Sequence, residues 1–313
     1  MAIGNHKESG LLLYSLPVRE CLTVHDNQVL YTLIYIEIRT PRRTTGQMGM
    51  SIIMPAADKI RLVTTVVMSA FLWVSFALHA NAAEVRIAVA ANFTAVATEI
   101  AEAFEAKSGH VAVLSFGSTG QLYSQISQGA PFDVFLAADQ IHPQKIHDAG
   151  MGSGTPPITY AIGKIVLWSL DPALIQGDDA LQEGNFDHLA IANPETAPYG
   201  KAAMETLQAL GLAETLKPRL VRGNNVAQTF QFIATGNAEL GFIAQSQAPK
   251  DGNGSQWIIP ENLYQPIRQD AVLLRNGANN EAAIAFLDYL NGPKAIRIIK
   301  EFGYGTSANG SSQ

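Results

Sequence analysis

Short apolar runs alternate with amphipathic helical segments along most of the chain, and this alternation limits the possible fold more than any other feature. Residues 85–91 form an apolar run that is typical of a buried strand. In the segment that follows, Val96, Ile100 and Phe104 recur at helical spacing. Because strands that alternate with helices pack as sheets covered by helices, the sequence predicts an α/β fold.

Two long β-type stretches, residues 160–169 and 264–274, interrupt this alternation. We interpret them as crossovers between two lobes, the first formed by residues 83–161 plus 267–313 and the second by residues 162–266. Each lobe is expected to hold a mainly parallel sheet flanked by helices, with the two crossover strands as a hinge. A ligand cleft between the lobes follows from this arrangement.

A signal peptide is predicted at residues 54–82. Lys59 and Arg61 precede an apolar run over residues 62–78, and an Ala-Asn-Ala cleavage pattern ends at residue 82. A membrane anchor is the alternative, because the run is slightly long for the apolar core of a signal peptide. Cleavage is favoured, since no charged stop-transfer cluster follows the run.

Residues 1–53 precede the predicted signal peptide, which is an unusual place for a domain. We interpret them as a non-native or unstructured extension, because Met48, Met50 and Met54 are all possible start sites. The alternative is a small β-rich extension, since residues 29–38 are typical of a strand.

Composition restricts the partners and the compartment. The net charge is −6 and no basic cluster is present, which argues against nucleic acid as a partner. The single cysteine, Cys21, precedes the predicted cleavage site, so the mature protein would use no disulfides. A soluble protein of the periplasm fits these features.

Four predicted strand-to-helix junctions carry small or hydrogen-bonding residues, and each lobe supplies two of them. The first N–H groups of a helix lack intrahelical partners, and the helix dipole adds partial positive charge at the same end. Anions bind at such helix starts, at the carboxyl ends of parallel strands. Each junction alone is more often a simple helix cap, so the prediction of an anion site rests on all four: residues 90–94, 115–120, 193–200 and 223–226.

The junctions offer neutral donors instead of cations. Asn92, Ser118 and Thr119 can add side-chain donors, and Tyr199 can add its N–H or its hydroxyl. A site of donors alone suits a fully deprotonated oxyanion such as molybdate, tungstate or sulfate, whereas phosphate retains a proton and favours a site with a carboxylate. Glu195, the nearest acidic residue, is expected to face solvent.

No catalytic or metal-binding constellation stands out. The turn at residues 117–120 lacks the ending of a phosphate-binding Walker loop, and no nucleophile elbow is present. His142 and His147 are interpreted as a solvated helix face, and Asp133 and Asp139 as turn or cap residues. We therefore expect no enzyme, no cofactor and no directly bound metal.

Taken in order, six segments resemble the periplasmic molybdate-binding proteins of ABC transporters: residues 85–94, 117–120, 129–134, 137–139, 160–164 and 193–200. The resemblance implies a two-lobe periplasmic-binding-protein fold and high-affinity binding of molybdate, and also of tungstate. It further implies a monomer that delivers the anion to a permease and its ATPase, touching the membrane complex only peripherally.

The resemblance also implies which residues contact the oxyanion: Ala91, Asn92, Ser118, Thr119, Tyr199 and the backbone N–H of Val226. Two positions depart from the commonest pattern of the family. Asn92 stands where many members have serine, and Ala244 stands where some members have a ligand tyrosine. Because those members have a small residue where this chain has Tyr199, the tyrosine is expected to come from another loop, as in a second subgroup.

Three alternatives remain open at this point. Sulfate or another tetrahedral oxyanion could be the ligand, because only the size of the site would distinguish it from molybdate. An enzyme acting on anionic substrates and an extracellular sensor or adhesion module with the same fold are the other two.

Overall fold

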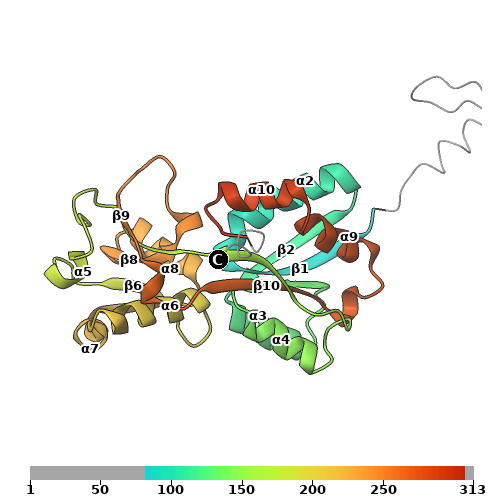
Figure 1. The fold of residues 1–313 in the computed structure, drawn as a ribbon, viewed down its shortest axis with the longest axis horizontal. Coiled ribbons are helices and arrows are strands. Elements are labelled where there is room, and N and C mark those ends of the chain that lie inside the picture. The colour runs from blue at the N-terminus through green and yellow to red at the C-terminus, as the bar shows by residue number, and fades with distance from the viewer. Residues whose placement is uncertain (1–81, 307–313) are drawn as a thin grey trace, which may run out of the picture. The chain divides into compact units, whose positions relative to one another are not determined.

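The computed structural model describes residues 82–306, which fold into two five-stranded sheets with helices on both faces of each (Figure 1). The predictions for residues 1–53 and for nearly all of the signal peptide lie outside the described residues. Within residues 82–306, no helix is long and apolar enough to cross a membrane.

The first lobe is built on a sheet with the strand order β2-β1-β3-β10-β4. Its strands are β1 (Glu84–Ala90), β2 (Val111–Gly117), β3 (Val134–Leu136), β4 (Ile158–Gly163) and β10 (Ile267–Leu273). Helices α2 (Thr94–Ser108), α9 (Glu281–Leu290) and α10 (Pro293–Glu301) lie on one face, and α3 (Thr119–Ser127) and α4 (Ile141–Asp148) lie on the other (Figure 1). The short 3-10 turns η1 (Ala91–Phe93) and η5 (Arg275–Gly277) complete this lobe.

The second lobe is built on a sheet with the order β7-β6-β8-β5-β9. Its strands are β5 (Ile165–Ser169), β6 (Leu189–Ala192), β7 (Leu220–Gly223), β8 (Leu240–Ala244) and β9 (Ser255–Ile258). Its helices are α5 (Ala180–Glu183), α6 (Pro198–Ala209), α7 (Ala213–Leu216) and α8 (Val226–Ala234), and its 3-10 turns are η2 (Lys217–Arg219), η3 (Gln245–Gln247) and η4 (Glu261–Leu263).

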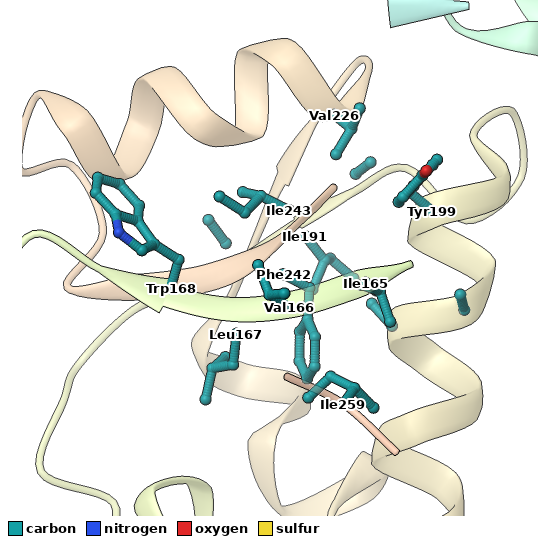
Figure 2. Packing of buried hydrophobic residues seen from close by; sticks show 14 of the residues in the cluster. Ile165, Val166, Leu167, Trp168, Ile191, Tyr199, Val226, Phe242, Ile243 and Ile259 are labelled. Atoms are coloured by element: carbon teal, nitrogen blue, oxygen red, sulfur yellow. The ribbon is translucent and has the colours of Figure 1, made fainter. Parts of the chain in front are cut away.

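Each lobe has its own apolar core, which follows the sequence periodicity. Val96, Ile100 and Phe104 on α2 are almost completely buried, as their helical spacing predicts. Phe104 packs edge-to-face on a phenylalanine of α9, with ring centroids 5.3 Å apart. In the second lobe, β5 is buried along its whole length, and its side chains Ile165 to Trp168 lie in the apolar core (Figure 2). Trp168 also stacks on the Phe230 ring of α8.

The α/β class is confirmed, but both sheets are mixed. In the first sheet, β1 is parallel to β2 and β3, whereas β10 is antiparallel to β3 and β4. In the second sheet, β6 is parallel to β7 and β8, whereas β5 is antiparallel to β8 and β9. The antiparallel pairs arise because the crossing segments run directly from one sheet into the other.

Two segments cross between the lobes. Only Lys164 separates β4 from β5, so residues 160–169, predicted as one β-type stretch, are divided between the two sheets. The return crossing runs through η4 to β10, where Ile267 pairs with Gly163. The end of β4 thereby lies next to the start of α6, where a side chain at Gly163 would touch Tyr199.

Candidate functional site

A small cavity of about 200 Å³ lies where the junctions of the two lobes meet. All six predicted site residues line it, together with six others from the same and neighbouring turns. Its small size suits an occupant of a few atoms, such as a small ion. The lining residues are Ala90, Ala91, Asn92, Gly117, Ser118, Thr119, Ala138, Ala197, Pro198, Tyr199, Asn225 and Val226.

The first junction is the turn η1, which directly follows β1. Ala91 and Asn92 are at its start and are 4% and 3% exposed. The Asn92 side chain was predicted to be a donor to the ligand, but its Nδ2 donates instead to Gln269 Oε1 at 2.9 Å and to Tyr304 Oη at 3.0 Å. Asn92 is thus held by these two partners, and the backbone N–H groups of η1 are the donors that this junction offers.

The second junction is the start of α3. The buried Ser118 hydroxyl has no hydrogen-bond partner within the described residues. The Thr119 hydroxyl oxygen accepts a bond of 3.0 Å from the N–H of Ala138, so its own proton is available to another acceptor. An unpartnered buried hydroxyl is costly unless something accepts its proton, and both hydroxyls lie on the cavity.

The third junction is the start of α6, where Pro198 occupies the first helical position and Tyr199 follows it. The Tyr199 side chain is 2% exposed and its hydroxyl accepts a hydrogen bond of 3.3 Å from Gln269 Nε2. A side chain at Gly163, the last residue of β4, would collide with this hydroxyl. The sequence of the hinge therefore makes room for the tyrosine.

The fourth junction is the start of α8, on the same edge of the second sheet as Tyr199 (Figure 2). Asn225 is the N-cap, and its side chain accepts the N–H of Gln228 at 2.9 Å. That cap leaves the N–H of Val226, at the first helical position, without an intrahelical partner. Val226 is 3% exposed and lines the cavity.

The cavity is neutral but polar. None of its lining residues, all within residues 82–306, is a lysine, arginine, aspartate or glutamate. Burial raises the pKa of the Tyr199 hydroxyl well above its ordinary value, and the neighbouring Tyr304 adds to this shift. The tyrosine therefore stays protonated near neutral pH and keeps its capacity to donate.

Direct hydrogen bonds join the lobes around the cavity. The N–H of Gly120 on α3 donates to Thr196 O in the second lobe at 2.9 Å. Ser246 Oγ on η3 donates to Asn92 O at 3.1 Å and lies 2.9 Å from Tyr304 Oη. With all lining residues except Pro198 and Asn225 buried as well, the lobes are closed around the cavity in this structure.

A larger groove of about 1,140 Å³ adjoins the cavity and shares Ala138, Ala197 and Pro198 with it. This interlobe groove differs in being lined by ionisable side chains of both signs. They are Asp139, His142, Lys145, Glu195, Lys201, Glu205 and Arg268. Glu195 is exposed, as the sequence predicted.

Of the other side chains singled out in the sequence, Asp133, Asp139 and His142 have structural partners, whereas the buried Nδ1 of His147 has none within residues 82–306. Asp139 accepts the N–H of His142 at the start of α4, and its other oxygen lies 2.7 Å from the His142 ring. Asp133 accepts the N–H of Arg86 at 2.8 Å, next to β3. Within residues 82–306, no group of three or more His, Cys, Asp or Glu side chains could hold a metal ion.

Sequence reasoning missed a buried polar network behind the cavity, formed by Gln269, Tyr160 and Tyr304 around Asn92. It also missed Ala138, whose N–H orients Thr119. Gln269 gave no clear signal, because it stands between two charged residues, Arg268 and Asp270, in the sequence of β10. Tyr304 gave none, since it follows the last helix in a segment without periodicity.

Comparison with known proteins identifies relatives of the whole described part of the chain. A family profile described as "Bacterial extracellular solute-binding protein" matches residues 85–305. The molybdate-binding protein ModA of Azotobacter vinelandii is 54% identical over 233 residues, which cover 73% of this chain and 92% of the relative. The molybdate-binding protein ModA of Rhodobacter capsulatus is 50% identical over 230 residues, covering 74% and 91%. The solved periplasmic molybdate-binding protein of A. vinelandii superposes with a TM-score of 0.69 at 39% identity, covering 71% of this chain and 98% of that one.

Proposed function

We propose, from the premise that this chain belongs to the bacterial extracellular solute-binding protein family, that it binds molybdate between its two lobes. The anion would then be delivered to the permease and ATPase of an ABC importer. The observation on which the proposal depends is the small cavity of neutral donors drawn from helix starts of both lobes. Tungstate, which has the same charge and shape, is proposed as a second ligand.

The chemistry of the lining supports a fully deprotonated oxyanion. The proposed contacts are the backbone N–H groups at Ala91, Asn92 and Val226, the hydroxyls of Ser118 and Thr119, and Tyr199. A hydrogen bond to a charged acceptor contributes about 1.5–3 kcal/mol. Several such bonds offset the desolvation of a dianion, and the helix dipoles at the same points favour negative charge.

The same lining disfavours the alternatives. A protonated phosphate would need an acceptor, and no carboxylate lines the cavity among the described residues. An enzyme would need a nucleophile with a base in hydrogen-bond reach, but the cavity offers hydroxyls without a histidine or carboxylate beside them. We therefore propose a binding protein without catalytic activity, acting in the periplasm as a monomer.

Isothermal titration tests the ligand. Molybdate and tungstate are expected to bind at least about 100-fold more tightly than sulfate, because a cavity shaped for the larger anion leaves sulfate with longer hydrogen bonds. Equal affinity for sulfate and molybdate would contradict the molybdate assignment. Hydrolysis of a phosphate or sulfate ester by the purified protein would favour an enzyme instead.

A matched pair of variants at Val226 tests the backbone donor separately from the side chain. Val226→Pro removes the N–H at the first helical position, where proline is well tolerated, whereas Val226→Ala keeps it. The extended backbone of Asn225 (φ −153°, ψ 173°) is compatible with a following proline. We expect Val226→Pro to weaken molybdate binding about 10- to 100-fold and Val226→Ala by less than about threefold. Equal effects of the two variants would contradict a role for this N–H.

A further inference from the structure

Gly120 is a point of direct backbone contact between the two lobes. It is the second residue of α3, and its N–H donates to Thr196 O in the second lobe at 2.9 Å. Neither residue lines the cavity, but their chain neighbours Thr119 and Ala197 do. The contact therefore lies one residue away from the cavity in each lobe.

The backbone conformation at Gly120 does not require a glycine. Its φ lies outside the left-handed region, unlike the φ of +89° at Gly129, which follows α3. Within a regular helix such as α3, alanine is more favourable than glycine, because glycine loses more conformational freedom on folding. Taken alone, the glycine at this position therefore weakens α3.

A side chain at position 120 would instead meet the other lobe. The three atoms nearest to an added Cβ would all belong to Thr196: Cα at 3.1 Å, O at 3.2 Å and Cβ at 3.3 Å. Carbon atoms in good contact are about 3.5–4.0 Å apart. Gly200, in the first turn of α6, differs because its Cβ would lie 2.1 Å from Ala192 O of its own lobe. Gly200 is thus needed for packing within a lobe, and Gly120 for the approach of one lobe to the other.

The loop that carries Thr196 is held by its own hydrogen bonds. Asn193 O accepts the N–H of Thr196 at 3.2 Å and the N–H of Ala197 at 2.8 Å, and α6 begins at Pro198. The atoms that a side chain at Gly120 would meet are backbone atoms and a Cβ, which cannot turn away like the end of a flexible side chain. An added methyl group is therefore expected to keep the lobes apart.

We propose that Gly120 is a positioning residue that sets how closely the two lobes approach around the bound oxyanion. This inference rests on the proposed function. The N–H of Gly120 has no partner within α3, and closure of the lobes supplies Thr196 O as its acceptor. An alanine at this position keeps every donor of the cavity but holds the donors of the two lobes further apart. Because hydrogen bonds weaken with distance, the anion is then bound less tightly.

The test separates affinity from stability. Gly120→Ala replaces a glycine inside a helix, so the urea midpoint for unfolding of the ligand-free protein should stay the same or rise. Molybdate affinity should nevertheless fall about tenfold, mainly through faster dissociation in stopped-flow measurements. Gly120→Val adds more bulk at the same point and should lower the affinity at least about 100-fold.

Two control variants show what other causes would look like. Ser127→Ala also raises the helix propensity of α3, but at its exposed last residue, and should change molybdate affinity less than about twofold. Gly200→Ala creates a collision within the second lobe and should lower the unfolding midpoint and the affinity together. Wild-type affinity in Gly120→Ala would overturn the proposal. A loss of affinity that comes with a lower unfolding midpoint, as in Gly200→Ala, would overturn it as well.

Hydrogen exchange at the Gly120 amide provides a second measurement, on the unmodified protein. Saturation with molybdate should slow this exchange at least about tenfold, because the bond to Thr196 O forms when the lobes close. Equal exchange rates with and without molybdate would overturn the proposal. If the wild type prefers sulfate to molybdate, the proposed function fails, but the same variants measured with sulfate still test Gly120. Binding of no tetrahedral oxyanion by the wild type would overturn both.

Discussion

The cavity and the interlobe groove adjoin each other, yet they use opposite chemistry. The cavity has about 200 Å³ and is lined by buried, neutral groups, whereas the groove has about 1,140 Å³ and is lined by carboxylates, lysines and an arginine. Lys201 illustrates the difference, because its side chain is 61% exposed and lies 3.8 Å from Glu205. Such an exposed ion pair contributes little to the stability of the fold.

The difference indicates how a site can hold an anion without a countercharge. A lysine or arginine in the cavity would attract any anion, including protonated ones, whereas fixed N–H and O–H groups bind only where acceptors match them. Charges on the surface act at longer range, on the approach of a ligand, and are screened by salt. Four predictions test this division between buried neutral donors and peripheral charges.

The largest effect is expected from a charge placed inside the cavity. Ser118→Asp retains a preferred helix cap, but its carboxylate would lie beside the anion. Two like charges about 4 Å apart repel by about 4 kcal/mol near a protein surface, so molybdate affinity should fall about 1,000-fold in isothermal titration. Gln265→Glu adds the same charge at the exposed groove and should change affinity less than about threefold. Similar losses in the two variants would remove the distinction between the regions.

A smaller loss is expected from Thr119→Val, which keeps the shape of the side chain and removes its hydroxyl. The anion loses a donor, so affinity should fall about 10- to 100-fold. The N–H of Ala138 also loses its acceptor, and unfolding in urea should show about 1–3 kcal/mol of lost stability. Thr206→Val is the control, because the Thr206 hydroxyl is buried and bonds Ala202 O away from the cavity. If Thr206→Val weakened molybdate binding equally, the loss of affinity in Thr119→Val would come from reduced stability alone.

Ser246 tests the contacts that close the lobes. Ser246→Ala removes the bond to Asn92 O and the contact with Tyr304, while all donors of the cavity remain. We expect affinity to fall about two- to tenfold, mainly through faster dissociation in stopped-flow measurements. Ser169→Ala removes a bond of 2.6 Å within the second lobe and should leave dissociation unchanged. An unchanged dissociation rate in Ser246→Ala would show that this contact does not hold the closed state.

The smallest effect concerns pH. Burial raises the pKa values of Tyr160, Tyr199 and Tyr304 above their ordinary value of 10, so molybdate affinity should be constant between about pH 7 and 9. A group whose pKa is raised on folding contributes its full stability below the unfolded value and loses it as the pH rises. The free energy of unfolding should therefore decline above about pH 10, less steeply in Tyr199→Phe. A change of affinity below pH 9 would mean that another group titrates in the site.

Sequence periodicity predicted the α/β class, the α2 core positions and the four junctions that meet at the cavity. Local chemistry sufficed there, because the start of a helix after a strand is a feature of neighbouring residues. The sheet order and the antiparallel β5 and β10 were not predictable in the same way, since they depend on how distant segments pair. For the same reason the bonds from Asn92 to Gln269 and Tyr304, separated by 177 and 212 residues, left no local signal.

The closure of the lobes has a consequence for the time course of exchange. The lining of the cavity is buried, and hydrogen bonds from Gly120 and Ser246 cross between the lobes. A bound ion can leave for solvent only after these hydrogen bonds break. The rate at which the lobes open therefore sets an upper limit on the rate of ion release. Raising the concentration of a competing anion would not shorten the residence time of the bound ion. The rate of exchange with a radioactive anion would measure how often the hinge opens and would not depend on which ion is bound.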